Sequence, residues 1–273
     1  MHPQPTFSPS MKKSQNIKNK LLSVSAIVGL LVLWQGLSSL GVIPRFMLPA
    51  PSDVVKAFNN DFSLLMYHAR TTLLEAFLGL TFGILLGFIF AVVMDHVSWF
   101  HKMFYPLIIL TQTIPTVALA PLLVLWMGYG LLPKITLIIL TSFFPITMGC
   151  MNGFQSCDKD ALNLMKSMGA NTLQTFRHIK FPHALPYFFS SLKISVSYSL
   201  IGAVIAEWLG GYSGLGVYMT RVRKSYSFDK MFAVIFFISF LSLVLMGFVS
   251  WLQKRTQPWL DAETLQRDGA DNS

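Results

Sequence analysis

Long apolar segments separated by short polar stretches make up most of this sequence. About 20 apolar residues cross the roughly 30 Å hydrocarbon core of a bilayer, so segments of this length are typical of membrane-spanning helices. We expect six spans, at residues 21–40, 71–94, 103–127, 135–151, 188–206 and 231–252. They are too long for the strands of a membrane barrel. The pattern therefore predicts an all-α membrane protein with six transmembrane helices.

Two charged side chains fall inside these segments. Glu75 lies near the start of the second span and Lys193 near the start of the fifth. We expect both to reach the membrane interface, Lys193 by extending its long aliphatic stem. The alternative for Glu75 is a proton-carrying site, because carboxylates within a membrane are often functional.

The composition agrees with a membrane protein and changes how the charge is interpreted. Charged residues make up only 12% of the chain and hydrophobic residues 53%, whereas soluble domains carry about 25% charged residues. The net charge is +9. The basic residues lie mostly around the apolar segments, where membrane topology and anionic lipid headgroups explain them. We therefore expect membrane lipids, and no nucleic acid, as partners.

Basic residues also indicate the orientation. Lys12, Lys13, Lys18 and Lys20 precede the first span, which favours a cytoplasmic N-terminus. With six spans, the C-terminus is then cytoplasmic as well. We expect a cytoplasmic tail at 1–20, a transmembrane domain at 21–255 and a second cytoplasmic tail at 256–273. The alternative for the first segment is a cleaved signal peptide, but it is longer than a usual signal core and no clear cleavage site follows it.

The polar loop at about 155–186, between the fourth and fifth spans, carries helix start and stop signals. Asp158 and Asp160 suit a helix start, and residues 159–168 have helical composition. Gly169 can adopt a positive φ and end that helix. Asn171 or Thr172 can cap a second helix. Pro182 and Pro186 then precede the fifth span. The signals predict two short cytoplasmic helices around a turn, and the alternative is an amphipathic loop on the membrane surface.

The spacing in this loop resembles the coupling loop of ABC-importer permeases. That family's pattern is Glu-Ala-Ala, three residues, Gly, nine residues, Ile, one residue and Leu-Pro. The chain keeps Gly169, Ile179 and Pro182 at these intervals but has Asn163-Leu164-Met165 for Glu-Ala-Ala and Phe181 for Leu. The ionic role of the family's Glu is therefore not carried over, although Asn163 can hydrogen-bond and Asp160 can add charge. The resemblance implies that a cytosolic ATPase contacts Asp160, Asn163, Gly169, Ala170, Phe176, Ile179 and Pro182.

Other motifs are similar to the branch of permeases for nitrate, sulfonates, taurine and related solutes. They are Leu48-Pro49-Ala50-Pro51-Ser52, Gln112-Thr113-Ile114-Pro115, Ala118-Leu119-Ala120-Pro121-Leu122, Trp126-Met127-Gly128-Tyr129-Gly130 and Gly214-Leu215-Gly216. Within this branch, Phe143-Phe144-Pro145, Ile201–Glu207 and Asp229-Lys230-Met231-Phe232-Ala233 look similar to permeases for hydroxymethylpyrimidine, a thiamine precursor. The resemblance implies that precursor or a relative as substrate. The alternative is an anion of the sulfonate, taurine or nitrate type.

The third span contains three prolines beside polar residues. Pro106, Pro115 and Pro121 each remove a backbone donor and kink a helix. Kinked helices with polar neighbours suit the lining of a path that must rearrange. We expect Gln112, Thr113 and Pro115 to line a translocation path. The alternative is bending for packing, with Gln112 bonded to another helix.

Glu207 and Trp208 close the fifth span on its predicted outer side, and Gly214 and Gly216 follow in the next loop. We interpret these four residues as an outer gate or a docking surface for a solute-binding protein. The alternative is an interfacial anchor, because Trp prefers that depth.

No motif indicates chemistry on this chain. Cys150 and Cys157 form no CxxC pair, and the histidines show no metal-ligand spacing. We expect no catalytic residue, no metal and no bound cofactor.

The family resemblance implies a partner for each remaining task. ATP and magnesium would lie on a cytosolic ATPase dimer, an extracytoplasmic binding protein would deliver the solute, and a second permease copy would complete a homodimer. The membrane would be the inner membrane of a prokaryote. The competing classes are an ion-driven secondary carrier, which needs midplane carboxylates, and a membrane enzyme, which needs a clustered nucleophile and base.

Overall fold

The computed structural model describes residues 9–41, 43–44 and 47–258, and within these residues the regular structure is helical, with no strand. The helices are α1 (Pro9–Ser39), α2 (Pro51–Asn60), α3 (Phe62–His96), α4 (Ser98–Thr113), α5 (Thr116–Met127), α6 (Leu131–Gln155), α7 (Lys159–Ser167), α8 (Thr172–Thr175), the π-helical η1 (Phe176–Lys180), α9 (Phe181–Gly210), α10 (Leu215–Lys224) and α11 (Phe228–Thr256). The predicted all-α class is confirmed for the described residues.

Four helical segments are long and apolar enough to cross a membrane. They are α3, α6, the continuous helix Thr172–Gly210 and α11. The apolar part of α1 described here, Val24–Ser39, is shorter than a span. Helix α1 begins at Pro9, so it also covers part of the predicted tail 1–20, while residues 1–8 and 259–273 lie outside the described residues.

The predicted third span, 103–127, is not one straight helix. Its place is taken by α4 and α5, which are bent by 101° at Ile114 and Pro115. Proline has no N–H to donate and disfavours helical geometry in the residue before it. Ile114 accordingly has an extended ψ of 122°. The predicted kink is therefore confirmed, but it is a complete break, and the bent pair supplies a fifth span only if its two halves are counted together.

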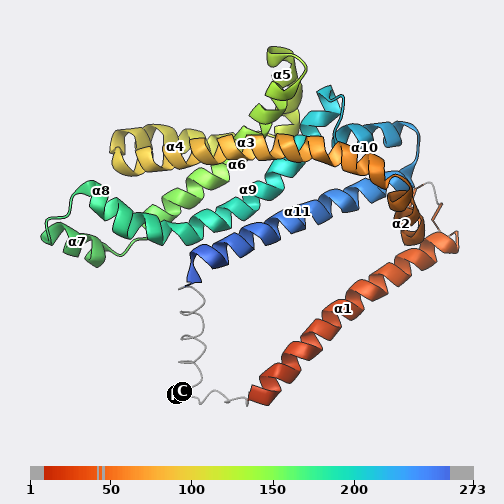
Figure 1. Cartoon of the computed structure of the whole chain (residues 1–273), viewed down its shortest axis with the longest axis horizontal. Helices are drawn as coiled ribbons and strands as arrows, with labels where there is room; N and C mark the ends of the chain where they lie inside the picture. The colour runs from red at the N-terminus through yellow and green to blue at the C-terminus, as the bar shows by residue number, and fades with distance from the viewer. Residues whose placement is uncertain (1–8, 42, 45–46, 259–273) are drawn as a thin grey trace. The chain divides into compact units, whose positions relative to one another are not determined.

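Helices α3, α6 and α9 run side by side and carry the core of the larger unit (Figure 1). Glycines recur every fourth residue on α3, where a Cβ on Gly79 would lie 2.5 Å from the Cβ of Ile138 on α6. On the other face of α6, a Cβ on Gly153 would lie 2.7 Å from the Cα of Ala184 on α9. Small residues at this spacing let membrane helices approach closely. The glycines thus fix the three-helix core, a feature that our sequence analysis did not identify.

The fifth span begins earlier than its apolar pattern predicted. The helix runs without interruption from Thr172 to Gly210, with the π-helical turn Phe176–Lys180 immediately before Phe181 and Pro182. A π turn is a common way to accommodate an irregularity within a helix. Lys193 consequently lies well inside α9, although its position relative to the membrane interface stays a prediction.

The chain divides into two compact units, of which the larger comprises residues 62–221 with 234–258. In the smaller unit, the indole Nε1 of Trp34 donates a hydrogen bond to the carbonyl of Pro49 at 3.0 Å. Val54, Ala57 and Ala233 form its buried apolar cluster. These contacts tie α1 to the segment before α2 within this unit.

Candidate functional site

Residues 158–182, here called the helix-pair segment, lie at one end of the larger unit and contain α7, α8 and η1 (Figure 1). Asp158 caps α7 by accepting a hydrogen bond from the backbone N–H of Asp160 at 2.9 Å. Gly169 ends the helix with a φ of +78°. Asn171 caps α8 in a reciprocal capping box with Gln174, both bonds measuring 2.8 Å. The predicted caps and the turn at Gly169 are confirmed, but the second helix is not a separate short one, because α8 continues through η1 into α9.

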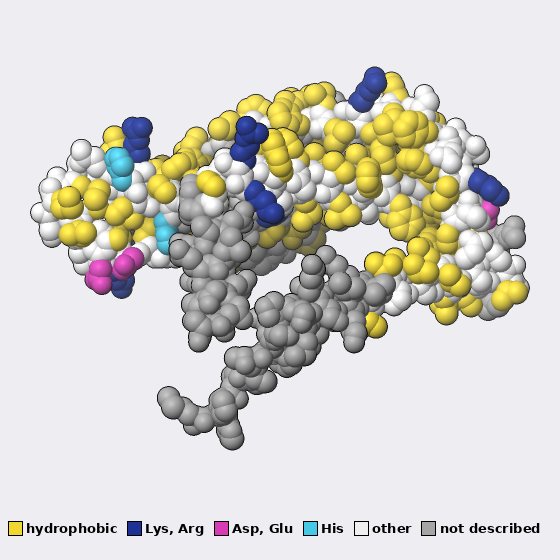
Figure 2. Space-filling model, turned by 60° about the horizontal axis from the view of Figure 1, so that its bottom comes forward, with side chains coloured by type: hydrophobic (Ala, Val, Ile, Leu, Met, Phe, Trp, Pro, Cys, Tyr) yellow, Lys and Arg dark blue, Asp and Glu magenta, His cyan; other side chains and the backbone are white. Residues whose placement is uncertain are grey.

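The helix-pair segment leaves apolar side chains uncovered. Helix α7 has no buried residue, and Leu164, Met168 and Leu173 are 62%, 74% and 72% exposed. Figure 2 shows hydrophobic side chains among charged ones at this end of the larger unit. Of the predicted contact residues, Asp160, Asn163 and Gly169 are exposed, while Ala170, Phe176, Ile179 and Pro182 are half-buried. Clustered exposed apolar side chains rimmed by polar ones indicate an interaction surface.

Two contacts hold the segment's second half to the core helices. The Lys180 ammonium donates to both carboxylate oxygens of Asp95 at the end of α3, at 2.8 and 2.7 Å. The ring of Phe176 lies 5.3 Å from that of Phe154 and 5.4 Å from that of His96. Cys157 is also buried here, and burial raises the pKa of its thiol. These contacts join η1 to both α3 and α6.

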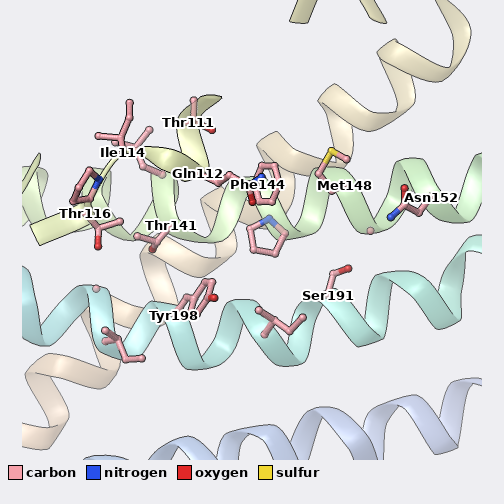
Figure 3. Close-up of a pocket in the computed structure, with 17 residues that line it drawn as sticks. Thr111, Gln112, Ile114, Thr116, Thr141, Phe144, Met148, Asn152, Ser191 and Tyr198 are labelled. Atoms are coloured by element: carbon pink, nitrogen blue, oxygen red, sulfur yellow. The ribbon is translucent and has the colours of Figure 1, made fainter. Parts of the chain in front are cut away.

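A cavity of about 670 Å³ lies beside the break between α4 and α5, lined by one face each of α6 and α9 (Figure 3). Gln112 and Pro115 line it as predicted path residues, but Thr113 does not, and its hydroxyl donates to the carbonyl of Leu110 on its own helix. Seventeen of the described residues line the cavity and none is charged. The polar lining residues are Thr111, Gln112, Thr116, Thr141, Asn152, Ser191 and Tyr198.

A buried polar cluster surrounds the C-terminal end of α9, here called the Glu207 cluster: His68 and Thr72 of α3, Glu207 of α9, and the loop residues Gly214–Gly216. It receives the N–H groups of Gly214, which precedes α10 (Leu215–Lys224), and of Leu215 and Gly216, which begin it. N–H groups at a helix start have no partner inside their own helix. Acceptors on α3 and α9 bind all three in succession. The pairs are Gly214 with His68 Nδ1 (3.0 Å), Leu215 with Thr72 Oγ1 (2.8 Å) and Gly216 with Glu207 Oε2 (2.6 Å).

Glu207 is the centre of this cluster and is only 1% exposed. Its second oxygen accepts a hydrogen bond from the hydroxyl of Thr72 at 2.7 Å. The loop passes so close that a Cβ on Gly216 would lie 3.0 Å from that of Glu207, and Gly214 has a φ of +128°. A carboxylate facing a helix N-terminus is favourably placed. The two predicted loop glycines and Glu207 are thus brought together, whereas Trp208 is 42% exposed and makes no hydrogen bond within the described residues.

Glu75 differs from its predicted place at the interface. It is 1% exposed and accepts a hydrogen bond from the ammonium of Lys134 at 2.6 Å. The apolar pattern predicts a fourth span from residue 135, which leaves Lys134 in a loop, but α6 starts at Leu131 and buries Lys134. The pair lies close to the Glu207 cluster in the chain, since Glu75 is three positions from Thr72 on α3 and therefore on the same helix face. The signal for this ion pair in the sequence was an acidic residue inside one predicted span, Glu75, together with a basic residue next to another, Lys134.

In the described residues, no group of three or more His, Cys, Asp or Glu side chains is arranged to hold a metal ion. The arrangement offers instead an exposed helix pair, an uncharged cavity and a buried charged cluster at different places on the same helices. This combination suits a membrane protein that changes shape around a solute.

Comparison with known proteins agrees with this description. The sequence model of the family described as "Binding-protein-dependent transport system inner membrane component" matches residues 83–258. A probable ABC transporter permease protein of Haemophilus influenzae is 37% identical over 240 residues, covering 88% of this chain and 98% of the relative. The formylaminopyrimidine transport permease protein ThiX of Halalkalibacterium halodurans is 33% identical over 231 residues, covering 84% and 92%.

One solved structure, described as an amino acid ABC transporter with histidines, superposes with a TM-score of 0.59 at 17% identity. The match covers 74% of this chain and 96% of the other chain. At this identity the similarity bears on the fold alone.

Proposed function

Because the chain belongs to the family of binding-protein-dependent transport system inner membrane components and is an ABC-importer permease subunit, we propose that it forms the gate through which a small solute crosses the membrane by alternating access. The energy comes from a separate ATPase that binds the two states of the permease with different affinity. ATP and magnesium bind to that ATPase dimer, and this chain holds no cofactor.

The exposed helix-pair segment supports ATPase docking most directly. Leu164, Met168 and Leu173 present apolar side chains that nothing in the described chain covers, on helices held by their own caps. A partner that buries them gains contact without unfolding the segment. The bond between Lys180 and Asp95 then carries the partner's movement to α3.

For the membrane arrangement, we propose six crossings. The α4–α5 pair provides one broken span, and α1 provides the first span despite its short apolar part. Both termini face the cytoplasm of a prokaryote, and the protein lies in its inner membrane. The helix-pair segment is then cytoplasmic, and the Glu207 cluster lies at the outer side, where Glu207, Trp208, Gly214 and Gly216 form the outer gate. A solute-binding protein docks there, and a second copy of this chain completes the path lined by Gln112 and Pro115.

For the substrate, we propose hydroxymethylpyrimidine or a related thiamine precursor. The similarity to a relative named as a formylaminopyrimidine transport permease supports this class. The alternative is an anion of the sulfonate, taurine or nitrate type. An ion-driven carrier is disfavoured because both buried carboxylates of the described chain have partners. Glu75 is paired with Lys134, and Glu207 accepts hydrogen bonds from the hydroxyl of Thr72 and the N–H of Gly216.

The test is reconstitution of the chain with its ATPase and binding protein in proteoliposomes, followed by measurement of labelled pyrimidine uptake and ATP hydrolysis. We expect uptake that requires ATP and is unaffected by collapse of proton and sodium gradients. Uptake that proceeds without ATP and stops when a gradient is collapsed would establish the carrier class instead.

A further inference from the structure

Four polar side chains in the α6–α9 cavity make no hydrogen bond within the described chain: Gln112, Thr116, Asn152 and Tyr198. The hydroxyls of Thr111, Thr141 and Ser191, by contrast, donate to carbonyls of their own helices. The free groups are therefore two carboxamides, one phenol and the small hydroxyl of Thr116. Figure 3 shows Gln112 near Phe144 and Asn152 farther along α6. Asn152 lies about 12 Å from Phe144 by helical rise, so the two carboxamides occupy separate positions in the cavity.

Gln112, Phe144 and Tyr198 have complementary chemistry. A carboxamide presents a donor beside an acceptor, and it pairs through two hydrogen bonds with a ring nitrogen that lies next to an amino group. Phe144 on α6 and Tyr198 on α9 both line the cavity (Figure 3). Their flat rings are surfaces on which a heteroaromatic ring stacks.

The lining disfavours a fully charged solute. No cationic side chain lines the cavity among the described residues, so an anion would leave water without a charge partner, which is costly. One feature acts in the other direction. Helix α5 begins at Thr116 on the cavity wall without a side-chain cap, and helix N-termini attract anions.

We propose that Gln112, Phe144 and Tyr198 form a solute-binding site for an uncharged heteroaromatic ring that carries an amino group next to a ring nitrogen. The inference rests on the proposed function and deepens it. It assigns part of the substrate selectivity to the permease itself, and it separates the two substrate classes left open above, since sulfonate and nitrate offer neither a ring to stack nor an amino group to pair.

The experiment measures equilibrium binding of labelled solutes to the permease–ATPase complex in lipid nanodiscs, without binding protein, at mildly alkaline pH where the ring is uncharged. The probes are the amino-substituted hydroxymethylpyrimidine, the same ring without its amino group, and methanesulfonate. ATP hydrolysis is measured in the same preparation. The variants are Gln112→Leu, Tyr198→Leu and, as a matched control on the adjacent residue that does not line the cavity, Thr113→Val.

We expect the aminopyrimidine to bind more tightly than the other two probes. Gln112→Leu should weaken its binding by about five- to a hundredfold, Tyr198→Leu by about tenfold, and Thr113→Val by no more than about twofold. Equal or tighter binding of methanesulfonate, or unchanged binding by Gln112→Leu, would overturn the site. A complex that hydrolyses ATP but binds no aminopyrimidine overturns this site alone, whereas a chain that associates with no ATPase overturns the proposed function together with it.

Discussion

Near each end of the long helix Thr172–Gly210, a helix begins with N–H groups that need acceptors, and the acceptors come from opposite kinds of place. At one end, α8 is capped by Asn171 and Gln174, which lie within three positions of each other. At the other end, α10 is capped by His68 and Thr72, more than 140 positions away in the chain, and by Glu207. Local caps hold a segment in shape while leaving its surface open to a partner, whereas distant caps bind a loop firmly to the core helices.

This comparison predicts that substitutions at the buried end lower stability and substitutions at the exposed end lower function. The largest effect should come from Lys134→Met, which leaves Glu75 buried without its counter-ion. We expect a loss of about 3–5 kcal/mol in the free energy of unfolding, measured by thermal or denaturant unfolding in detergent. Adding Glu75→Leu in the same chain should recover much of that loss, and no recovery would show that the pair has no mutual role.

Thr72→Val should have the next largest effect. It removes the acceptor for the N–H of Leu215 and the donor to Glu207, which leaves buried groups unsatisfied at a cost of about 1–3 kcal/mol. The neighbouring Thr71, whose half-buried hydroxyl contacts only Ser213 at 3.1 Å, is the matched control as Thr71→Val. Equal losses of stability in the two variants would show that the buried hydroxyl of Thr72 contributes no more than the half-buried hydroxyl of Thr71.

Gly169→Ala tests the exposed end through its backbone. No atom lies within 4 Å of the position where the added Cβ would be, but the φ of +78° is unfavourable for alanine. We expect a local cost of about 1–2 kcal/mol and a reduced ratio of solute uptake to ATP hydrolysis. Gly247→Ala adds a methyl group in equally open space without that φ. If both variants transport like the wild type, the shape of the helix-pair segment does not matter for coupling.

The smallest effect on stability should come from Leu164→Ser and Leu173→Ser. Both side chains are exposed, so unfolding should change by no more than about 0.5 kcal/mol. Binding of the ATPase should nevertheless weaken at least about fivefold if these residues are contact hot spots, as measured by co-purification and titration. Tyr212→Ser, at an equally exposed site on the other end, should leave ATPase binding unchanged. Undiminished binding in both leucine variants would place the docking surface elsewhere.

The same contrast explains what could be predicted from sequence. The caps at Asp158 and Asn171 and the turn at Gly169 depend on partners within a few positions, so their residue types are sufficient to locate them. The Glu207 cluster depends on residues that only the fold brings together. Glu207, Gly214 and Gly216 could be selected from the resemblance, but their contact with His68 and Thr72 could not.

Hydrophobicity alone was also a poor guide to helix boundaries. Lys134 lies one residue before the predicted fourth span and Lys180 lies in the predicted loop 155–186, so neither was assigned to a span. The structure places both within helices, each paired with an acidic residue of α3. The closely spaced glycines of α3 and α6 became interpretable only when the facing helices were known. The sharp angle at Pro115 likewise depends on what packs around it, since Pro106 and Pro121 lie inside unbroken helices.

The unbroken path from Thr172 to Gly210 has a mechanical consequence. Its 39 residues correspond to a helix about 58 Å long, with no loop between the end that carries the helix pair and the end that carries Glu207. If this helix tilts as a rigid body by about 5°, one end is displaced by about 5 Å relative to the other. The π-helical turn at Phe176–Lys180 is its one irregular stretch among the described residues and lies beside the anchor to Asp95. A small rotation applied there becomes a large displacement at the opposite end.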